Sequence, residues 1–288
     1  MNINHLRYFQ EVCKYENITK ASEVIHISQP SVTSAIKDLE NELGFQLFIR
    51  NGNRISLTPE GARFLEMTND MLLSFDNFYS KAVELGECHT TTLRVGIPAI
   101  LGTFFFERII PIFEQQNPNI HLTIHEVPTI TGIRMVNDAH LDFLIGVIED
   151  DFCSCNFKLI FETDLVFFSG RDHPLAKKKV ISKDMLANQP FIMVPKGSYH
   201  YKVISERYKD PPLNTVLYSN QVSTIAYMLK NNLAATILYK QVFEKDKNVC
   251  SRPLSEPLTA KIGIFWKKNI YVTNAMKKFI QFTKTIQA

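Results

Sequence analysis

The sequence predicts an α/β protein that begins with a winged helix-turn-helix. Short helical patterns and an Asn-Gly hairpin signal occupy residues 1–58. An uninterrupted apolar periodicity then extends over residues 59–88, which is typical of one long helix. From Thr92 onward, short apolar strands alternate with helices, the pattern of a sheet with mainly parallel pairing. These observations divide the chain into residues 1–58, 59–88 and 89–288.

The composition is that of a globular protein. The chain has 288 residues, enough for about two domains, with 45% hydrophobic and 21% charged side chains. No apolar stretch reaches the roughly 18 residues that a membrane-spanning helix requires, and no signal peptide is visible. Its five cysteines are irregularly spaced, so neither a disulfide framework nor a paired-cysteine zinc site is expected. We therefore expect a cytoplasmic protein that has no membrane partner.

Three helical patterns fill most of the N-terminal part. Residues 3–14 have the apolar spacing of an amphipathic helix. Thr19 follows a turn and is expected to cap the second helix. Ser28 is expected to cap the third helix, which has Pro30 in its first turn and Gly44 as its C-terminal cap. Two short helices joined by a turn indicate a helix-turn-helix.

The start of the third helix carries short polar side chains. Such a surface can press into the major groove of DNA, where a glutamine can bond adenine through two hydrogen bonds. Serine and threonine hydroxyls can contact bases or phosphates, and the helix N-terminus offers free N–H groups to a phosphate. The expected DNA contacts on these helices are Thr19, Ser28, Gln29, Pro30, Ser31, Thr33, Ser34 and Lys37.

A hairpin is expected over Gln46–Leu57, with Asn51-Gly52 as its turn. Its tip carries Arg50, Asn53 and Arg54, which suit the adjacent minor groove or the DNA backbone. The first 58 residues hold equal numbers of basic and acidic side chains, so DNA binding must depend on where individual cations lie. The alternative is a solvated helix and hairpin that bind no ligand.

The periodicity over residues 59–88 predicts a dimerisation helix. Thr58 is a suitable cap, and Pro59 falls in the first turn. Apolar residues then recur at alternating steps of four and three, the spacing of a coiled-coil seam. The alternative is a long helix that packs only on its own domain. The residues expected to meet a second copy of the chain are Phe64, Met71, Phe75, Phe78 and Leu85.

The remaining 200 residues are predicted to form the α/β part. The first strands are expected at Leu93–Ile97, His121–Val127 and Asp142–Val147, with helices at Phe104–Gln116 and Gly132–Ala139. This part carries a net charge of +7. Such a charge, together with helix N-termini, favours an anionic or strongly polar ligand.

Both halves of the chain contain short sequence motifs in a defined order. They include Ser28-Gln29-Pro30-Ser31-Val32-Thr33 and Leu57-Thr58-Pro59-Glu60-Gly61, then Leu93-Arg94-Val95-Gly96, Asn117-Pro118 and His173-Pro174-Leu175-Ala176. Over nearly the whole chain these motifs resemble those of the LysR-type transcriptional regulators. The resemblance implies a bacterial regulator, not an enzyme, that acts as a dimer or tetramer and binds double-stranded DNA. Two copies related by a two-fold axis would require an interrupted inverted repeat. RNA polymerase is a further implied partner.

The resemblance also implies a two-lobed effector domain that is similar to periplasmic binding proteins. Lobe I would comprise about 89–161 and 265–288, and lobe II about 162–264, with crossover strands near Glu162–Ser169 and Pro257–Ile264. A small-molecule effector, expected to be anionic or strongly polar, would bind between the lobes, where strands end and helices begin. The expected contacts are Ile100, Gly102, Thr103, Thr129, Thr131, Gly132, Ser198, Tyr199, Gln221 and Ser223. For each of these the alternative is an ordinary helix cap.

The sequence offers three alternatives to this function. Cys153 and Cys155 could form a redox pair or bind a metal, but their spacing is at the limit for a disulfide and no histidine is near. A transporter's solute-binding protein would share the α/β architecture but not the first 58 residues. A cytoplasmic enzyme would need a catalytic constellation, and none is visible. No cofactor or metal is therefore expected.

Overall fold

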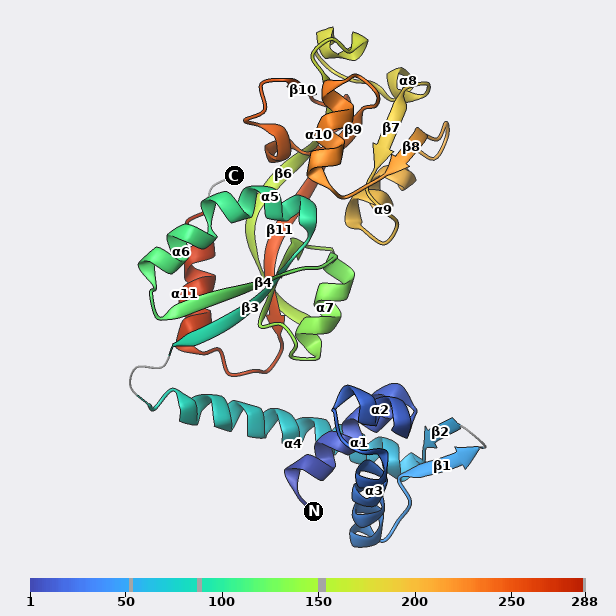
Figure 1. Ribbon diagram of the computed structural model, residues 1–288, viewed down its shortest axis with the longest axis vertical. Helices are drawn as coiled ribbons and strands as arrows, with labels where there is room; N and C mark the ends of the chain where they lie inside the picture. Colours follow the sequence, from blue (N-terminus) through green and yellow to red (C-terminus); the bar gives the residue numbers. More distant parts are fainter. Residues whose placement is uncertain (52–53, 87–89, 150–153, 287–288) are drawn as a thin grey trace. The chain divides into compact units, whose positions relative to one another are not determined.

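A computed structural model describes residues 1–51, 54–86, 90–149 and 154–286 of the chain (Figure 1). It forms two compact units. The first comprises Met1–Gly86 together with Asn269–Tyr271, and the second comprises Glu87–Lys268 together with Val272–Ala288. In the described part of the chain, no helix has the length and apolar character needed to cross a membrane.

The first unit contains the predicted helix-turn-helix and hairpin. Its elements are α1 (Ile3–Tyr15), α2 (Ile18–Val24), α3 (Gln29–Leu43), β1 (Phe48–Asn51), β2 (Arg54–Leu57) and α4 (Pro59–Val83). Its core joins Leu6 and Phe9 of α1 to Leu39 of α3 and Leu72 of α4. The amphipathic spacing predicted for the first helix therefore buries one face of α1 against the other helices.

The caps of α3 are confirmed, whereas that of α2 is corrected. The Ser28 hydroxyl accepts a hydrogen bond from the Ser31 N–H (3.3 Å), and Gly44 ends α3 with a left-handed φ of +77°. The cap of α2 is Asn17, whose side chain accepts a hydrogen bond from the Lys20 N–H (2.9 Å). Thr19 lies in the first turn instead, because Asn17 satisfies the same free N–H groups two residues earlier.

The hairpin is confirmed, with its connection shifted by one residue. Strands β1 and β2 pair antiparallel, and Asn51 lies opposite Arg54. Residues 52–53 therefore join the strands, rather than the expected Asn51-Gly52 pair. Gly52 and Asn53 lie outside the described residues.

Helix α4 begins where the sequence predicted and ends earlier. The Thr58 hydroxyl accepts a hydrogen bond from the Gly61 N–H (2.8 Å). The helix ends at Val83, so Leu85 follows it and is not part of its seam. The loop Asn269–Tyr271 joins this unit because the Asn77 side chain bonds the Asn269 carbonyl (2.9 Å) and the Tyr271 N–H (2.6 Å).

The second unit is the predicted α/β part. Its elements are β3 (Thr91–Ile97), α5 (Ala99–Arg108), α6 (Ile110–Gln116), β4 (Ile120–Glu126), α7 (Thr129–Asn137), β5 (Phe143–Val147), β6 (Cys155–Gly170), the 3-10 helix η1 (Pro174–Lys177), α8 (Lys183–Leu186), β7 (Pro190–Met193), α9 (Tyr199–Arg207), β8 (Asn214–Tyr218), α10 (Val222–Lys230), β9 (Thr236–Tyr239), η2 (Lys240–Phe243), β10 (Val249–Arg252), β11 (Leu258–Lys267) and α11 (Asn274–Thr283).

Two long strands connect the two lobes of this unit. The main sheet has the order β10-β6-β11-β5-β3-β4, and β9 also pairs with β6. Strands β6 and β11 pair antiparallel along most of their length and extend from one lobe into the other, as Figure 1 shows. Lobe I contains β3, β4 and β5, and lobe II contains β7 to β10. The expected crossover strands are therefore present.

Lobe I is a sheet covered by helices on both faces. Strand β3 pairs parallel to β4 and β5, and every residue of β5 is buried. Figure 1 shows α6 and α11 on one side of these strands and α7 on the other. Phe113 of α6, Phe143 of β5 and Phe279 of α11 pack together, with ring centres 5.0 to 5.3 Å apart. A strand buried on both faces explains why its sequence is a continuous apolar run.

Two helices of lobe I begin earlier than the sequence predicted. The helix expected at 104–116 is divided into α5 and α6 at Ile109, and Pro111 lies in the first turn of α6. The helix expected from Gly132 begins at Thr129, directly after Pro128. Prolines precede both early starts, since Pro98 stands before α5. Both prolines are extended N-cap residues, and a proline at this position indicates that a helix begins at the next residue.

Candidate functional site

The outer face of α3 carries the predicted polar residues. Val32 and Ile36 of this helix are buried, whereas Gln29, Ser31 and Lys37 are exposed. Among the other predicted residues, Thr33 is half-buried and the rest on α2 and α3 are exposed, namely Thr19, Ser28, Pro30 and Ser34. A single helix face therefore presents hydroxyl, amide and ammonium groups from its first turn onward.

The hairpin flanks this face. Thr33 and Lys37 of α3 line a groove together with Phe48 of β1 and Ile55 of β2. Arg50 lies in β1 and Arg54 begins β2. Their side chains and the whole of Asn53 lie outside the described structure. The backbone thus places two cationic positions beside the polar helix face. Such an arrangement is suited to binding a groove of DNA and the phosphates beside it.

An apolar stripe runs along α4. We define the α4 stripe as Met67, Met71, Phe75 and Phe78, which have 67%, 53%, 36% and 69% of their surface exposed. Their spacing places them on one face of the helix. Phe64 was expected on this seam, but it packs on Phe9 with ring centres 5.3 Å apart. The first turns of α4 therefore belong to the core of their own unit, and the later turns leave an apolar face uncovered.

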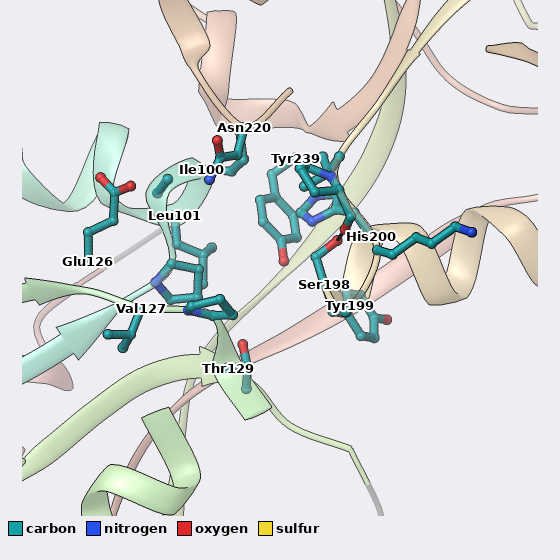
Figure 2. A pocket seen from close by; sticks show the side chains of 17 residues that line it. Ile100, Leu101, Glu126, Val127, Thr129, Ser198, Tyr199, His200, Asn220 and Tyr239 are labelled. Carbon is teal, nitrogen blue, oxygen red and sulfur yellow. Dashed lines mark hydrogen bonds between the residues drawn. The ribbon is translucent and has the colours of Figure 1, made fainter. Parts of the chain in front are cut away.

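A cavity of about 160 Å³ lies between the two lobes of the second unit (Figure 2). Three helix starts converge on it. Pro98 to Leu101 come from α5, Pro128 and Thr129 from α7, and Ser198 to His200 from α9. The loop Val194–Gly197, Glu126, Val127, Asn220 and Tyr239 complete the lining. Pro98 and Pro128 provide no side-chain cap, so among the described residues the N–H groups at the starts of α5 and α7 form no side-chain capping bond.

Four of the ten predicted effector contacts line this cavity: Ile100, Thr129, Ser198 and Tyr199. The other six do not: Gly102, Thr103, Thr131, Gly132, Gln221 and Ser223. The early starts of α5 and α7 explain part of this difference, since only the first turn of each helix reaches the cavity. Thr103 and Ser223 line a separate groove beside η2, and the Thr103 hydroxyl donates to the Ile100 carbonyl (2.8 Å).

Gly132 does not line the cavity; it allows α7 to pack closely against Leu144 of β5. A methyl group added at Gly132 would lie 2.3 Å from a methyl carbon of Leu144 on β5. We expect Gly132→Ala to lower the free energy of unfolding by about 1–3 kcal/mol, because the overlap forces α7 away from the sheet. Urea unfolding of both proteins measures this difference. An unchanged midpoint and slope would show that Leu144 moves aside without cost.

The sequence did not reveal the polar floor of the cavity. His200 of α9 and Tyr239 of β9 are buried, and their rings meet edge to face with centres 4.3 Å apart. Within the part of the chain that the structure describes, His200 Nε2 has no hydrogen-bond partner. A lone histidine in a helix and a tyrosine that ends an apolar strand carry no motif, so no sequence pattern could have paired them.

Burial lowers the pKa of His200 to about 3, from about 6.5 for an accessible imidazole. Between these values the unfolded chain binds the additional proton, so stability is lost as the pH falls below about 6.5. For each unit by which the pH decreases in this range, the free energy of unfolding of the wild type should decrease by about 1.4 kcal/mol more than that of His200→Phe. Urea unfolding between about pH 7 and pH 5 tests this. His173, whose pKa is also lowered by burial, remains in both proteins, so equal slopes would contradict the assignment to His200.

The charged groups near the cavity are balanced. Lys196 and Glu126 line it and are exposed. Glu149, which is not part of the lining, is paired with Lys202 of α9 (2.6 Å). Burial raises the pKa of Tyr199 and of Tyr239, and the Glu149 charge adds to both effects. The cavity is therefore lined by neutral aromatic and imidazole side chains and by one exposed side chain of each charge.

The described residues form no cluster of histidine, cysteine, aspartate or glutamate that could hold a metal ion. Cys155 begins β6, and burial is the largest influence that raises the pKa of its thiol. Cys153 lies outside the described residues. The described residues therefore do not test the disfavoured redox alternative for Cys153 and Cys155, and burial disfavours the thiolate form of Cys155.

Comparison with known proteins places both units in one group. Residues 3–62 match the family model described as bacterial regulatory helix-turn-helix protein, lysR family, and residues 88–287 match that of the LysR substrate binding domain. The HTH-type transcriptional regulator YwbI of Bacillus subtilis (strain 168), itself described as uncharacterized, is 31% identical over 296 residues, which cover 99% of this chain and 96% of that protein. The transcriptional dual regulator GltC of the same organism is 24% identical over 288 residues, covering 98% and 96%.

Solved structures share the fold. Full-length OxyR from Pseudomonas aeruginosa, in a variant form, has a TM-score of 0.63 at 21% identity and covers 98% of this chain and 99% of its own. Full-length BenM has a TM-score of 0.60 at 22% identity, with coverage of 99% and 96%. At these identities the likeness concerns the fold, which agrees with a helix-turn-helix followed by a two-lobed α/β domain.

Proposed function

Because the chain belongs to the LysR family of bacterial transcriptional regulators, we propose that a small molecule bound between its lobes controls how its helix-turn-helix binds DNA. The chain is a DNA-binding transcriptional regulator and not an enzyme. The observation that carries the proposal is the cavity itself. It is enclosed by three helix starts and has an unpaired polar atom at its floor. Such a site is built for a ligand.

The residues on the α3 face and in the hairpin support separate roles in DNA recognition, namely contacts with bases and contacts with phosphates. Gln29 and Ser31 lie exposed at the helix start, where an amide and a hydroxyl can reach base edges. Lys37, further along the same face, can also enter the major groove, and the arginines of the hairpin can hold the phosphate backbone or reach the minor groove. We expect sequence preference to come from α3, and the dependence of affinity on salt to come from the cations.

The α4 stripe supports a dimer. Exposed methionine and phenylalanine side chains on one helix face are apolar surface that a second copy of the chain can cover. Two copies are also needed because the first 58 residues carry no net charge, so one copy offers few phosphate contacts. A two-fold axis through the paired helices requires an interrupted inverted repeat in the DNA. A tetramer, a contact with RNA polymerase and a cytoplasmic location extend this proposal.

The two lobes support a switch. They are joined through β6 and β11, and the cavity takes residues from both of them. A ligand that contacts both lobes stabilises one arrangement of the lobes, and it shifts the DNA-binding geometry only if its affinity for the two arrangements differs.

Selection of bound duplexes from a random-sequence library tests the DNA-binding part of this proposal. The full chain is expected to enrich two half-sites in inverted orientation, separated by a fixed spacer. Nuclease protection of the selected duplex should cover both half-sites, and this duplex is the operator for measurements on variants of the chain. Enrichment of a single unrepeated site would contradict the dimeric arrangement.

A further inference from the structure

His200 Nε2 has an unusual position in the second unit. Among the described residues of this unit, it is the buried side-chain nitrogen or oxygen that has no hydrogen-bond partner. The residue is 4% exposed and lines the cavity from the first turn of α9 (Figure 2). Buried polar atoms in folded proteins are almost always paired, so an unpaired one beside a cavity indicates that a ligand group pairs with it.

Tyr239 adds a second polar atom to the same floor. Its ring packs against the His200 imidazole, and Figure 2 shows its hydroxyl pointing toward the interior of the cavity. A neutral imidazole has one donor and one acceptor nitrogen, and a tyrosine hydroxyl can donate or accept. A ligand hydroxyl can satisfy both residues whichever imidazole nitrogen carries the hydrogen.

The charges around the cavity disfavour an anion at this floor. The net charge of +7 that suggested an anionic ligand belongs to the whole C-terminal part, whereas Lys196 and Glu126 are the ionic side chains of the lining and cancel. Glu149 lies close enough to act on both Tyr199 and Tyr239, and a neutral imidazole supplies no positive charge. The free N–H groups at the helix starts favour an anion by themselves, but they can also bond a neutral oxygen.

The size of the cavity limits the ligand further. A volume of about 160 Å³ is close to that of engineered protein cavities that hold one benzene molecule. Leu101, Val127 and Val194 give the walls an apolar character. These dimensions suit one six-membered ring with a single polar substituent.

We propose that the effector is a compact, uncharged molecule of about the size of one ring, which brings a hydroxyl group to His200 and Tyr239. This inference rests on the proposed function, because it names the ligand class of the same cavity. Within it, His200 is the residue that determines specificity, since its unpaired nitrogen penalises any ligand that fills the cavity without a hydrogen-bonding group.

Calorimetric titration of the full chain with phenol, toluene and benzoate tests this proposal. Phenol and toluene have nearly the same shape and differ in the hydroxyl, whereas benzoate adds a charge. We expect the wild type to bind phenol about 10-fold to 100-fold more tightly than toluene. In His200→Phe this preference should disappear while toluene still binds, and Tyr239→Phe should reduce it. Thr131→Val, on the exposed face of α7 outside the cavity, is the matched control and should behave as the wild type.

A nitrogen NMR spectrum of the 15N-histidine-labelled wild type provides a readout that needs no variant. Phenol should shift the imidazole signals of His200 and leave those of the buried His173 unchanged. Equal affinities for phenol and toluene, or benzoate binding more tightly than phenol, would overturn the uncharged-hydroxyl proposal and leave the cavity as an effector site. Binding of none of the three probes, with the His200 signals unmoved, would overturn both.

Discussion

Replacing Met71 and Phe78 by aspartate is expected to convert the regulator into monomers that bind the selected operator poorly. Both side chains are more than half exposed in the single chain, so the substitutions leave its core intact. In a dimer they would bury four carboxylates in an apolar seam, and such burial without partners costs several kcal/mol. We expect the dimer dissociation constant to rise at least about 100-fold. Sedimentation equilibrium measures the association, and fluorescence anisotropy measures binding to the operator.

The matched control for this experiment is Ser80→Asp. Ser80 lies half a turn around α4 from Met71, so the same charge is added on the opposite side of the helix. It should leave both the dimer and the operator affinity nearly unchanged. Urea unfolding of each variant checks that the fold persists. A Met71→Asp, Phe78→Asp protein that remains dimeric would place the interface elsewhere on the chain.

Gln29→Ala is expected to relax the base preference of the operator complex. If Gln29 bonds a base through two hydrogen bonds, its loss should reduce discrimination at one base pair of each half-site by about 1–3 kcal/mol. Affinity for unrelated duplexes should hardly change. The measurement is competition between the selected duplex and a series of singly substituted duplexes, each titrated with wild type and variant at the same salt concentration.

Arg54→Ala is the comparison that separates base reading from phosphate binding. Arg54 begins β2 in the hairpin, outside the recognition helix. Its removal should weaken all duplexes alike and lower the slope of log affinity against log salt by about one. If Arg54→Ala changed base preference while Gln29→Ala changed nothing, the assignment of recognition to α3 would be wrong.

The elements of the first unit were predictable because their signals are local. Ser28, Pro30 and Gly44 define α3 through caps and a first-turn proline, and each of these acts within one helical turn. The same local chemistry misled where two candidate caps compete, as Asn17 and Thr19 do before α2. The exposed or buried state of seam residues was not predictable either. Phe64 and Phe78 share one spacing, but the core of the helix-turn-helix covers only the first.

The residues of the cavity also separate into those that the sequence indicated and those that only the structure revealed. From the sequence alone it followed that strands end shortly before Ile100 and Thr129 and that a helix begins near Ser198, because apolar strand runs and helix caps are read from neighbouring residues. The starts of α5 and α7 were expected a few residues too late. Only the tertiary structure decided which of these helix starts face one another and that His200 and Tyr239 close the floor. The reason is physical. The partners lie on α5, α7, α9 and β9, and their meeting depends on the antiparallel pairing of β6 with β11, which no local pattern encodes.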